Sequence, residues 1–188
     1  MPNTYPAGAE KLIVHALEGR MPPAGMLPFH FGYLVMSVTS LWAVGRRILE
    51  GRPSIDRPLT LVVPDQPARN IIAPVGIPFA GLLDLFNVPF DPARQILLAG
   101  GMMMGRQVSP DDCVTKGTNA VFIQTPTRRQ RKQEDPCILC GACFDACPLK
   151  LHPINMAERI RQKKASPALK AHLDECFLCG ACSAVCPA

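Results

Sequence analysis

CILCGACFDACP, over residues 137–148, and CFLCGACSAVCP, over residues 176–187, are the stretches that decide how this chain folds at its C-terminal end. Each run contains four cysteines with the spacing C-x2-C-x2-C-x3-C, and a proline follows the last of them. Eight of the 12 positions are identical between the two runs. The runs therefore form an internal repeat, and together they hold eight of the nine cysteines of the 188-residue sequence.

The spacing of these cysteines indicates iron–sulfur clusters. Three thiolates separated by two residues can wrap one cubane, and in sequences with two such runs the fourth cysteine, before the proline, ligates the cluster of the other run. The predicted ligands of the first [4Fe–4S] cluster are Cys137, Cys140, Cys143 and Cys186. Those of the second are Cys176, Cys179, Cys182 and Cys147. The sequence thus predicts two clusters in one module that carries single electrons.

The residues between these cysteines suit a cluster environment. Gly141 and Gly180 allow backbone N–H groups to approach the cluster sulfides, because glycine has no side chain. Apolar side chains beside the ligands are expected to exclude water and so to tune the reduction potential. These side chains are Ile138, Leu139, Phe177 and Leu178.

Two four-cysteine zinc sites are the alternative, because each run also contains C-x2-C pairs of the zinc-ribbon type. We disfavour them, since such a site uses neither the third cysteine of each triplet nor the x3-Cys-Pro ending. The ninth cysteine, Cys113, has no ligand position left and is expected to be a bystander. No two histidines lie at metal-ligand spacing, so all four are expected to be structural or solvated: His15, His30, His152 and His172.

Charge and hydropathy limit the possible functions. The net charge is +5, and the basic residues gather in two short stretches, 128–132 and 159–164. Neither contains an aromatic residue, so we expect solvated faces, or docking to an acidic partner or anionic lipid, rather than binding to nucleic acid. The most apolar stretch, 33–44, is shorter than the roughly 20 residues that a membrane span needs. The first residues do not resemble a secretion signal, which predicts a cytoplasmic chain.

Hydrophobic periodicity predicts a mixture of short strands and helices. With 20 prolines and 14 glycines, long regular elements are not expected. Apolar, partly β-branched runs bounded by Pro, Gly or Asp predict strands over 32–38, 59–63, 70–73, 95–99 and 119–124. Helical spacing predicts helices over 10–17, 79–86, 155–164 and 167–173. Ser166 is the expected N-cap of the last of these helices.

One further helix is predicted with its start, its end and its buried face. It begins at Thr39 or Ser40 as N-cap and ends at Glu50, before Gly51. Its inward stripe is expected to consist of Leu41, Val44, Ile48 and Leu49. Trp42 on this helix, and the methionines Met102, Met103 and Met104, are expected to pack in the core.

Several segments carry a resemblance to a known family. They are the two cysteine runs with their PLKLHP extension (Pro148 to Pro153), TYPAGAEKLI (Thr4 to Ile13), GRMPPAGMLP (Gly19 to Pro28), GGMMMG (Gly100 to Gly105) and VTKGTNAV (Val114 to Val121). Through them the chain resembles, over nearly its whole length, the C subunit of the Rnf (Rsx) ion-translocating electron transport complex and its relative, the PduS-type cobalamin reductase. It departs from the family's GGPMMG pattern at Met102, where proline is expected.

The resemblance implies four parts and an α+β fold class. Residues 1–31 correspond to the remnant of an upstream domain that binds FMN and NADH, and residues 32–124 to a soluble-ligand-binding β-grasp (SLBB) domain. A linker over 125–136 leads to a ferredoxin-like module with two [4Fe–4S] clusters over 137–188. FMN and NADH are expected only if an upstream domain or a partner chain supplies their site, so this chain alone is not expected to oxidise NADH.

The implied function is electron transfer within an Rnf-like complex. The expected partners are a flavin- and NADH-binding chain, ferredoxin and membrane subunits. The expected location is the cytoplasmic face of the inner membrane, with membrane contact through partners. Two alternatives stay open: part of a PduS-type cobalamin reductase, and a non-catalytic docking or assembly module whose clusters are structural. No catalytic residue is predicted in any of these cases.

Overall fold

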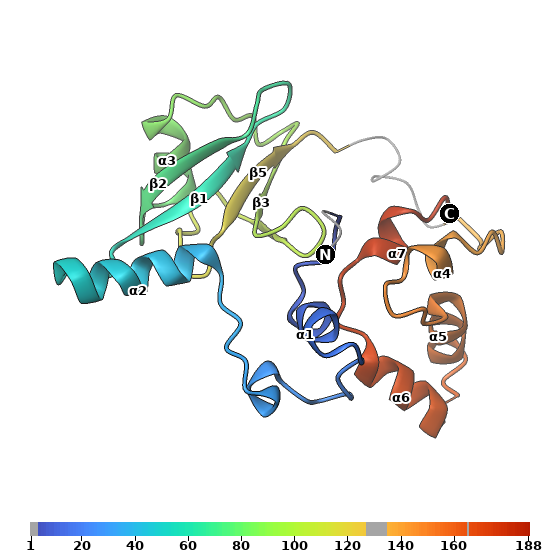
Figure 1. Ribbon diagram of the computed structural model, residues 1–188. Coiled ribbons are helices and arrows are strands. Elements are labelled where there is room, and N and C mark those ends of the chain that lie inside the picture. The colour runs from blue at the N-terminus through green and yellow to red at the C-terminus, as the bar shows by residue number, and fades with distance from the viewer. Residues whose placement is uncertain (1–3, 127–134, 165) are drawn as a thin grey trace. The chain divides into compact units, whose positions relative to one another are not determined.

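The computed structural model describes residues 4–126, 135–164 and 166–188 (Figure 1). These residues form two compact units. One lies within Met36–Gln133, and the other combines Met1–Val35 with Glu134–Ala188. The first unit contains a five-stranded sheet, whereas the described part of the second contains helices and no strand. The chain is therefore α+β, as its sequence predicts.

The strands of the first unit form one mixed sheet in the order β2-β1-β5-β3-β4. β1 pairs antiparallel with β2 and parallel with β5, while β3 lies antiparallel to both β5 and β4. Four predicted strands are confirmed, and the short β4 was not predicted. The strands span β1 (Asp56–Val62), β2 (Arg69–Pro74), β3 (Ile96–Ala99), β4 (Arg106–Val108) and β5 (Ala120–Gln124).

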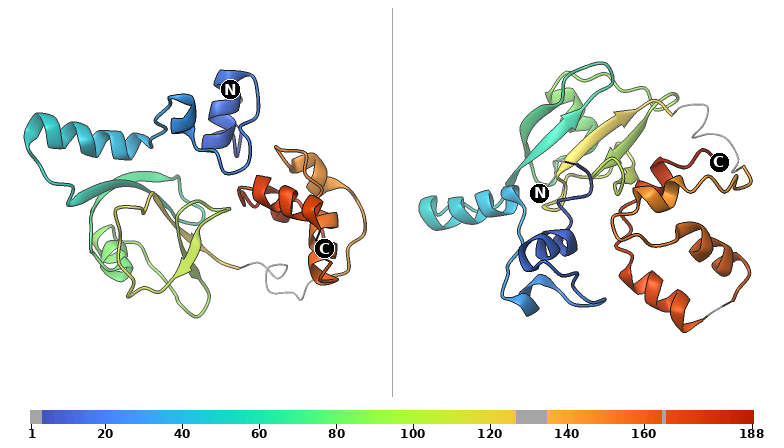
Figure 2. Two further views of the ribbon diagram at one scale, coloured as in Figure 1. Left: turned by 90° about the horizontal axis from the view of Figure 1, so that it is seen from below. Right: turned by 45° about the vertical axis from the view of Figure 1, so that its right-hand side comes forward.

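The core of this unit lies between the sheet and α3 (Phe79–Leu85), which covers one face of the sheet (Figures 1 and 2). Phe79, Leu82 and Leu83 of the helix are buried there. In and just after β1, Leu59, Leu61 and Val63 are buried, because alternate side chains of a strand point to the same face. Each such buried side chain contributes about 1.5–3 kcal/mol of hydrophobic stabilisation.

The strand predicted over 32–38 is wrong, because the helix α2 (Val38–Glu50) already begins at Val38. Ser37 is its N-cap, rather than Thr39 or Ser40, and its hydroxyl accepts a hydrogen bond from the backbone N–H of Ser40 at 3.2 Å. Apolar residues before a cap do not make a strand by themselves, since a strand needs a neighbour to satisfy its backbone. The predicted helix end at Glu50, followed by Gly51, is confirmed.

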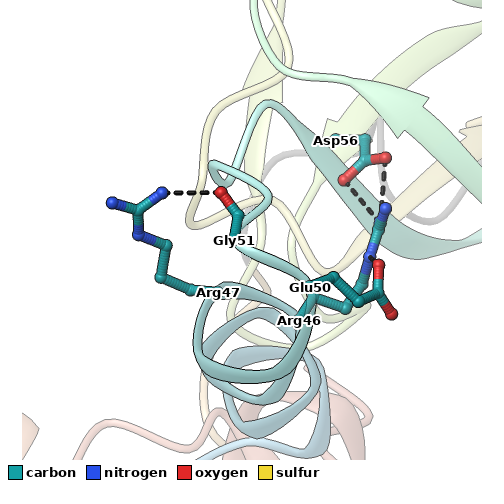
Figure 3. Close-up of polar contacts among 5 residues, drawn as sticks. All are labelled: Arg46, Arg47, Glu50, Gly51 and Asp56. Atoms are coloured by element: carbon teal, nitrogen blue, oxygen red, sulfur yellow. Dashed lines mark hydrogen bonds and ion pairs between the residues drawn. The ribbon is translucent and has the colours of Figure 1, made fainter.

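The inward stripe predicted for α2 is also wrong: Leu41, Val44, Ile48 and Leu49 are exposed. The opposite side of the helix contacts the sheet instead. Arg46 forms an ion pair of 3.1 Å with Asp56 of β1 (Figure 3). The Arg46 guanidinium also lies 4.5 Å from the centre of the Trp42 ring, so Trp42 is half-buried beneath a cation rather than packed in the core. Helical periodicity identified an apolar face, but not what covers it.

The methionines of GGMMMG are not in the core either. Met102 and Met104 are exposed, and Met103 is half-buried. The segment forms a tight turn in which a Cβ at Gly105 would collide with the backbone oxygen of Gly101. This close approach requires glycine and holds the methionines between the flanking glycines at the surface.

The second unit consists of short helices. The predicted helices over 10–17, 155–164 and 167–173 are confirmed, whereas the two short helices within the cysteine runs were not predicted. Ser166 caps α6 as expected, its hydroxyl accepting a hydrogen bond from the N–H of Leu169 at 3.1 Å. The elements are α1 (Glu10–Glu18), η1 (Pro28–Phe31), α4 (Ala142–Ala146), α5 (Pro153–Arg161), α6 (Pro167–Glu175) and α7 (Ala181–Ala184).

The described residues of 1–35 pack in the same unit as the cysteine runs, although the resemblance assigns residues 1–31 to an upstream domain. Most of the expected linker over 125–136, namely residues 127–134, lies outside the described residues. Within the described part of the chain, no helix has both the length and the apolar character that crossing a membrane requires.

Candidate iron–sulfur centre

The two cysteine runs share one backbone conformation. Leu139 and Leu178, at matching positions, both have φ of 56°, and Gly141 and Gly180 both have φ of 77°. Each glycine is the N-cap of the short helix that follows it, α4 or α7. The repeat in the sequence is therefore a repeat in the structure, in which two equal turns each lead into a short helix.

The backbone of the first turn faces a thiol. The N–H of Leu139 donates a hydrogen bond to Sγ of Cys137 at 3.4 Å. Hydrogen bonds of this kind stabilise a thiolate ligand and raise the potential of the cluster that it holds. A leucine with positive φ is strained by about 1–2 kcal/mol, and such strain persists where the surrounding structure enforces it, often at functional sites.

Cysteines of both runs meet in one pocket. Cys137, Cys140 and Cys143 of the first run and Cys186 of the second line a pocket of about 110 Å³, together with apolar residues that include Ile154 and Pro187. These are the four cysteines that the spacing predicts as ligands of the first cluster. Soft thiolates around a largely apolar void suit an iron–sulfur cluster, because burial and thiolate ligation are what such clusters require.

Two of the other four cysteines pack against a small core. Cys147 and Cys176 pack against the buried residues Leu151, Met156 and Leu169. Burial raises the pKa of the Cys182 thiol, and the nearby Cys179 adds to the increase. Bound iron would reverse this effect, since a coordinating thiol loses its proton.

All the thiols are available for ligation, because none of the nine cysteines, all of which the structure describes, forms a disulfide. Among the residues that the structure describes, no three His, Cys, Asp or Glu side chains are grouped closely enough to hold a single metal ion. Cys113 belongs to the sheet-containing unit and is exposed.

Water exclusion by the apolar neighbours of the ligands stays a prediction, and two of these neighbours, Ile138 and Leu139, line the pocket of the first run. Ile138, Leu139 and Leu178 are exposed, the last two by 78% and 79%. At Leu139 the backbone N–H faces the thiol of Cys137. Phe177 is half-buried.

An aromatic stack beside the first run was missed from the sequence. The ring of Phe144, in α4 next to Cys143, stacks on His152 with 4.5 Å between ring centres. Lys150 donates a hydrogen bond to the backbone oxygen of Asp145 at 3.0 Å and lies 5.6 Å from the Phe144 ring. These contacts fix α4 to the segment that leads into α5. The PLKLHP extension, which holds both Lys150 and His152, was the available signal.

The N-terminal segment also reaches the cysteines, and sequence reasoning missed this. Tyr5 donates a hydrogen bond from its hydroxyl to the backbone oxygen of Cys179. Partial burial raises the pKa of Tyr5, and Cys179 adds to the increase. Lys11 of α1 forms an ion pair with the carboxylate of Glu175, the residue before Cys176. The TYPAGAEK segment contains both residues, but nothing in the sequence says what they contact.

Gly141→Ala is expected to make a reconstituted cluster about 5 to 30 times more labile to a chelator. No atom of the chain lies within 4 Å of a Cβ at Gly141, so the obstacle that the chain itself presents is the φ of 77°, which costs an alanine about 1–2 kcal/mol. Iron release to a chelator, followed by absorbance, measures the effect. Gly141→Asn is the matched control, because asparagine tolerates this conformation and should lose iron more slowly. Equal rates for both variants would contradict the role given to φ.

The two cysteine runs lie in a region that matches a known family of domains. Residues 136–188 match the family described as "4Fe-4S dicluster domain". The C subunit of the ion-translocating oxidoreductase complex of Vibrio cholerae is 35% identical over 158 residues, which are 81% of this chain and 20% of that protein. This chain is homologous to the C subunits of such complexes. The resemblance to the Rnf C subunit is thereby confirmed.

Two further relatives belong to complexes named for the ion that they move. One is the C subunit of the Na(+)-translocating ferredoxin:NAD(+) oxidoreductase complex of Acetobacterium woodii, 33% identical over 82% of this chain and 35% of that protein. The other is the C subunit of the proton-translocating ferredoxin:NAD(+) oxidoreductase complex of Clostridium ljungdahlii, 33% identical over 81% of this chain and 34% of that protein. The chain thus spans between 20% and 35% of the length of these curated relatives.

The match over 136–188 is an electron-transfer domain related to the Rnf C subunit, and its eight cysteines imply two [4Fe–4S] clusters. The prediction of iron–sulfur rather than zinc is therefore confirmed.

Proposed function

We propose that this chain relays single electrons in an Rnf-like ion-translocating oxidoreductase complex, through two [4Fe–4S] clusters ligated crosswise by its two cysteine runs. The observation that carries the proposal is the pocket in which Cys186 of the second run joins Cys137, Cys140 and Cys143 of the first. Homology to the Rnf C subunit over 81% of the chain supports the complex.

The clusters would supply one-electron redox chemistry at two sites, and the protein's own residues hold those sites. Cys137, Cys140, Cys143 and Cys186 would hold the first cluster, and Cys176, Cys179, Cys182 and Cys147 the second. Crosswise ligation ties α4 to α7, two helices that contact each other within one unit. A module locked in this way changes shape little when it gains an electron, which favours fast transfer.

The sheet-containing unit is proposed to be a β-grasp domain that docks the chain to its partners. The strand order β2-β1-β5-β3-β4, the parallel pairing of the first and last strands, and a single helix between β2 and β3 support this proposal. The exposed apolar residues of α2 are consistent with docking.

The partners are proposed by analogy with the relatives. A chain or domain that binds FMN and NADH, ferredoxin, and membrane subunits are the expected redox partners, with the chain peripheral on the cytoplasmic face of the membrane. NADH oxidation by this chain alone is expected to be absent. The four-part division at residues 31, 124 and 136 stays part of this proposal.

Anaerobic reconstitution with iron and sulfide tests the function directly. We expect about eight irons per chain, and EPR signals from two interacting clusters after reduction with dithionite. Cys113→Ser is the matched control and should leave the iron count unchanged. Zinc, or fewer than about four irons, would overturn the proposal.

The same preparation separates the two alternatives. Clusters that assemble but accept no electron at any accessible potential would favour a structural role in docking or assembly. Reduction of a corrinoid by the chain together with a flavoprotein would favour a cobalamin reductase of the PduS type.

A further inference from the structure

The N-terminal segment holds the second cysteine loop, residues 176–182, at two points. Tyr5 donates its hydroxyl hydrogen to the backbone oxygen of Cys179, in the middle of that loop. Lys11 forms an ion pair with Glu175, the last residue of α6. The Lys11 ammonium also donates a hydrogen bond of 3.5 Å to the backbone oxygen of Glu175. The second contact therefore fixes the residue directly before Cys176.

The segment that makes these contacts is itself folded. α1 buries Val14, and its C-terminal residue Glu18 accepts a hydrogen bond from the hydroxyl of Tyr33 at 2.7 Å. This bond ties the helix to the chain that follows η1. Tyr5 and Lys11 thus extend from a packed structure, which can hold the loop in place at low entropic cost.

The first cysteine loop, residues 137–143, has no such support. In the described part of the chain, no hydrogen bond or ion pair joins residues 4–35 to it. Two loops with the same sequence pattern and the same φ values therefore differ in what surrounds them. This difference in surroundings can give the two clusters different reduction potentials.

We propose that Lys11 and Tyr5 are positioning residues that hold the second cysteine loop and set the reduction potential of its cluster, independently of the first. The proposal rests on the proposed function, since it requires that Cys176, Cys179 and Cys182 ligate a cluster. Lys11 acts through charge and Tyr5 through the polarised peptide that follows Cys179.

The charge effect has a definite sign. Lys11 and Glu175 neutralise each other beside Cys176, and their side chains are only 16% and 33% exposed, so water screens them incompletely. Removing the ammonium leaves a lone carboxylate, which repels an incoming electron and lowers the potential. Removing the carboxylate charge leaves a lone cation, which attracts the electron and raises the potential.

Potentiometric EPR titration of the reconstituted full chain tests this inference. We expect Lys11→Met to lower, and Glu175→Gln to raise, the ratio of reduced to oxidised cluster about tenfold at the wild-type midpoint, which equals about 59 mV for a one-electron couple. The double variant should return close to the wild-type midpoint, because it restores neutrality. Only one of the two cluster signals should move, and Cys179→Ala, which removes that signal, identifies it.

Tyr5→Phe removes the hydrogen bond to the second cysteine loop without changing the charge of the chain. We expect the second cluster to lose iron to a chelator several times faster than in the wild type, while the first cluster loses iron at an unchanged rate. This conservative variant also covers the case in which Lys11→Met fails to fold.

The outcomes of these experiments distinguish a failure of this inference from a failure of the proposed function. A wild-type chain that binds zinc, or fewer than about four irons, would overturn the proposed function. Two normal clusters, with midpoints unmoved in both charge variants or moved equally for both clusters, would overturn the role of Lys11. An unchanged rate of iron loss in Tyr5→Phe would overturn the role of Tyr5.

Discussion

Replacing Cys186 together with Cys140 by alanine is expected to leave about four irons per chain, whereas replacing Cys186 together with Cys179 is expected to leave almost none. In the crosswise arrangement Cys186 and Cys140 ligate the same cluster, so replacing both removes no more iron than replacing either one. Cys186 and Cys179 serve different clusters, so both are lost. Iron analysis and EPR of the reconstituted variants measure the difference.

The pair of double variants distinguishes the crosswise arrangement from its alternative. If each run ligated a single cluster by itself, the Cys186 and Cys179 variant would keep about four irons and the Cys186 and Cys140 variant would keep none. The iron counts of the two variants would then be exchanged. A Cys113→Ala chain, altered at the one cysteine outside the runs, serves as the control and should keep about eight irons.

Leu82→Ala is expected to reduce the free energy of unfolding of the sheet-containing unit by about 2–5 kcal/mol. Leu82 is fully buried between α3 and the sheet, so truncation removes apolar contacts and leaves a cavity. Trp42 is the only tryptophan of the chain and lies in this unit, so its fluorescence during denaturant unfolding reports on this unit.

Leu85→Ala is the matched control on the same helix. Leu85 is 57% exposed, so its truncation should change the free energy of unfolding by no more than about 0.5 kcal/mol. A Leu85 variant as unstable as the Leu82 variant would contradict the burial of α3, because the two substitutions remove the same atoms from the same helix.

Much of the sheet could be predicted because its signals are local. The strands β1, β2, β3 and β5 are apolar runs bounded by turn residues, and α3 buries the leucines that its periodicity indicates. The short β4, Arg106–Val108, has no apolar pattern, and its pairing with β3 makes it a strand. Residues 32–38 are the opposite case, since they have strand-like composition but no partner strand.

The helix α2 shows where periodicity is insufficient. Its helical spacing and its C-terminal glycine were visible in the sequence, yet the face with Leu41 and Ile48 is exposed. The face that contacts the sheet is held by the ion pair between Arg46 and Asp56 (Figure 3). Which face of an amphipathic helix is covered depends on the neighbouring elements, and a single sequence does not contain their positions.

For this protein the sequence by itself determined the chemistry of the centre: eight thiols at a spacing that suits two [4Fe–4S] clusters, in two runs that repeat each other. Ligand type and spacing are local properties of a chain, so they can be read without a fold. Only the tertiary structure decided that Cys186 joins the first run in one pocket, that the N–H of Leu139 faces the Cys137 thiol, and that the N-terminal segment contacts the second loop. Tyr5 and Cys179 are 174 residues apart, and a contact over that distance exists only once the chain has folded.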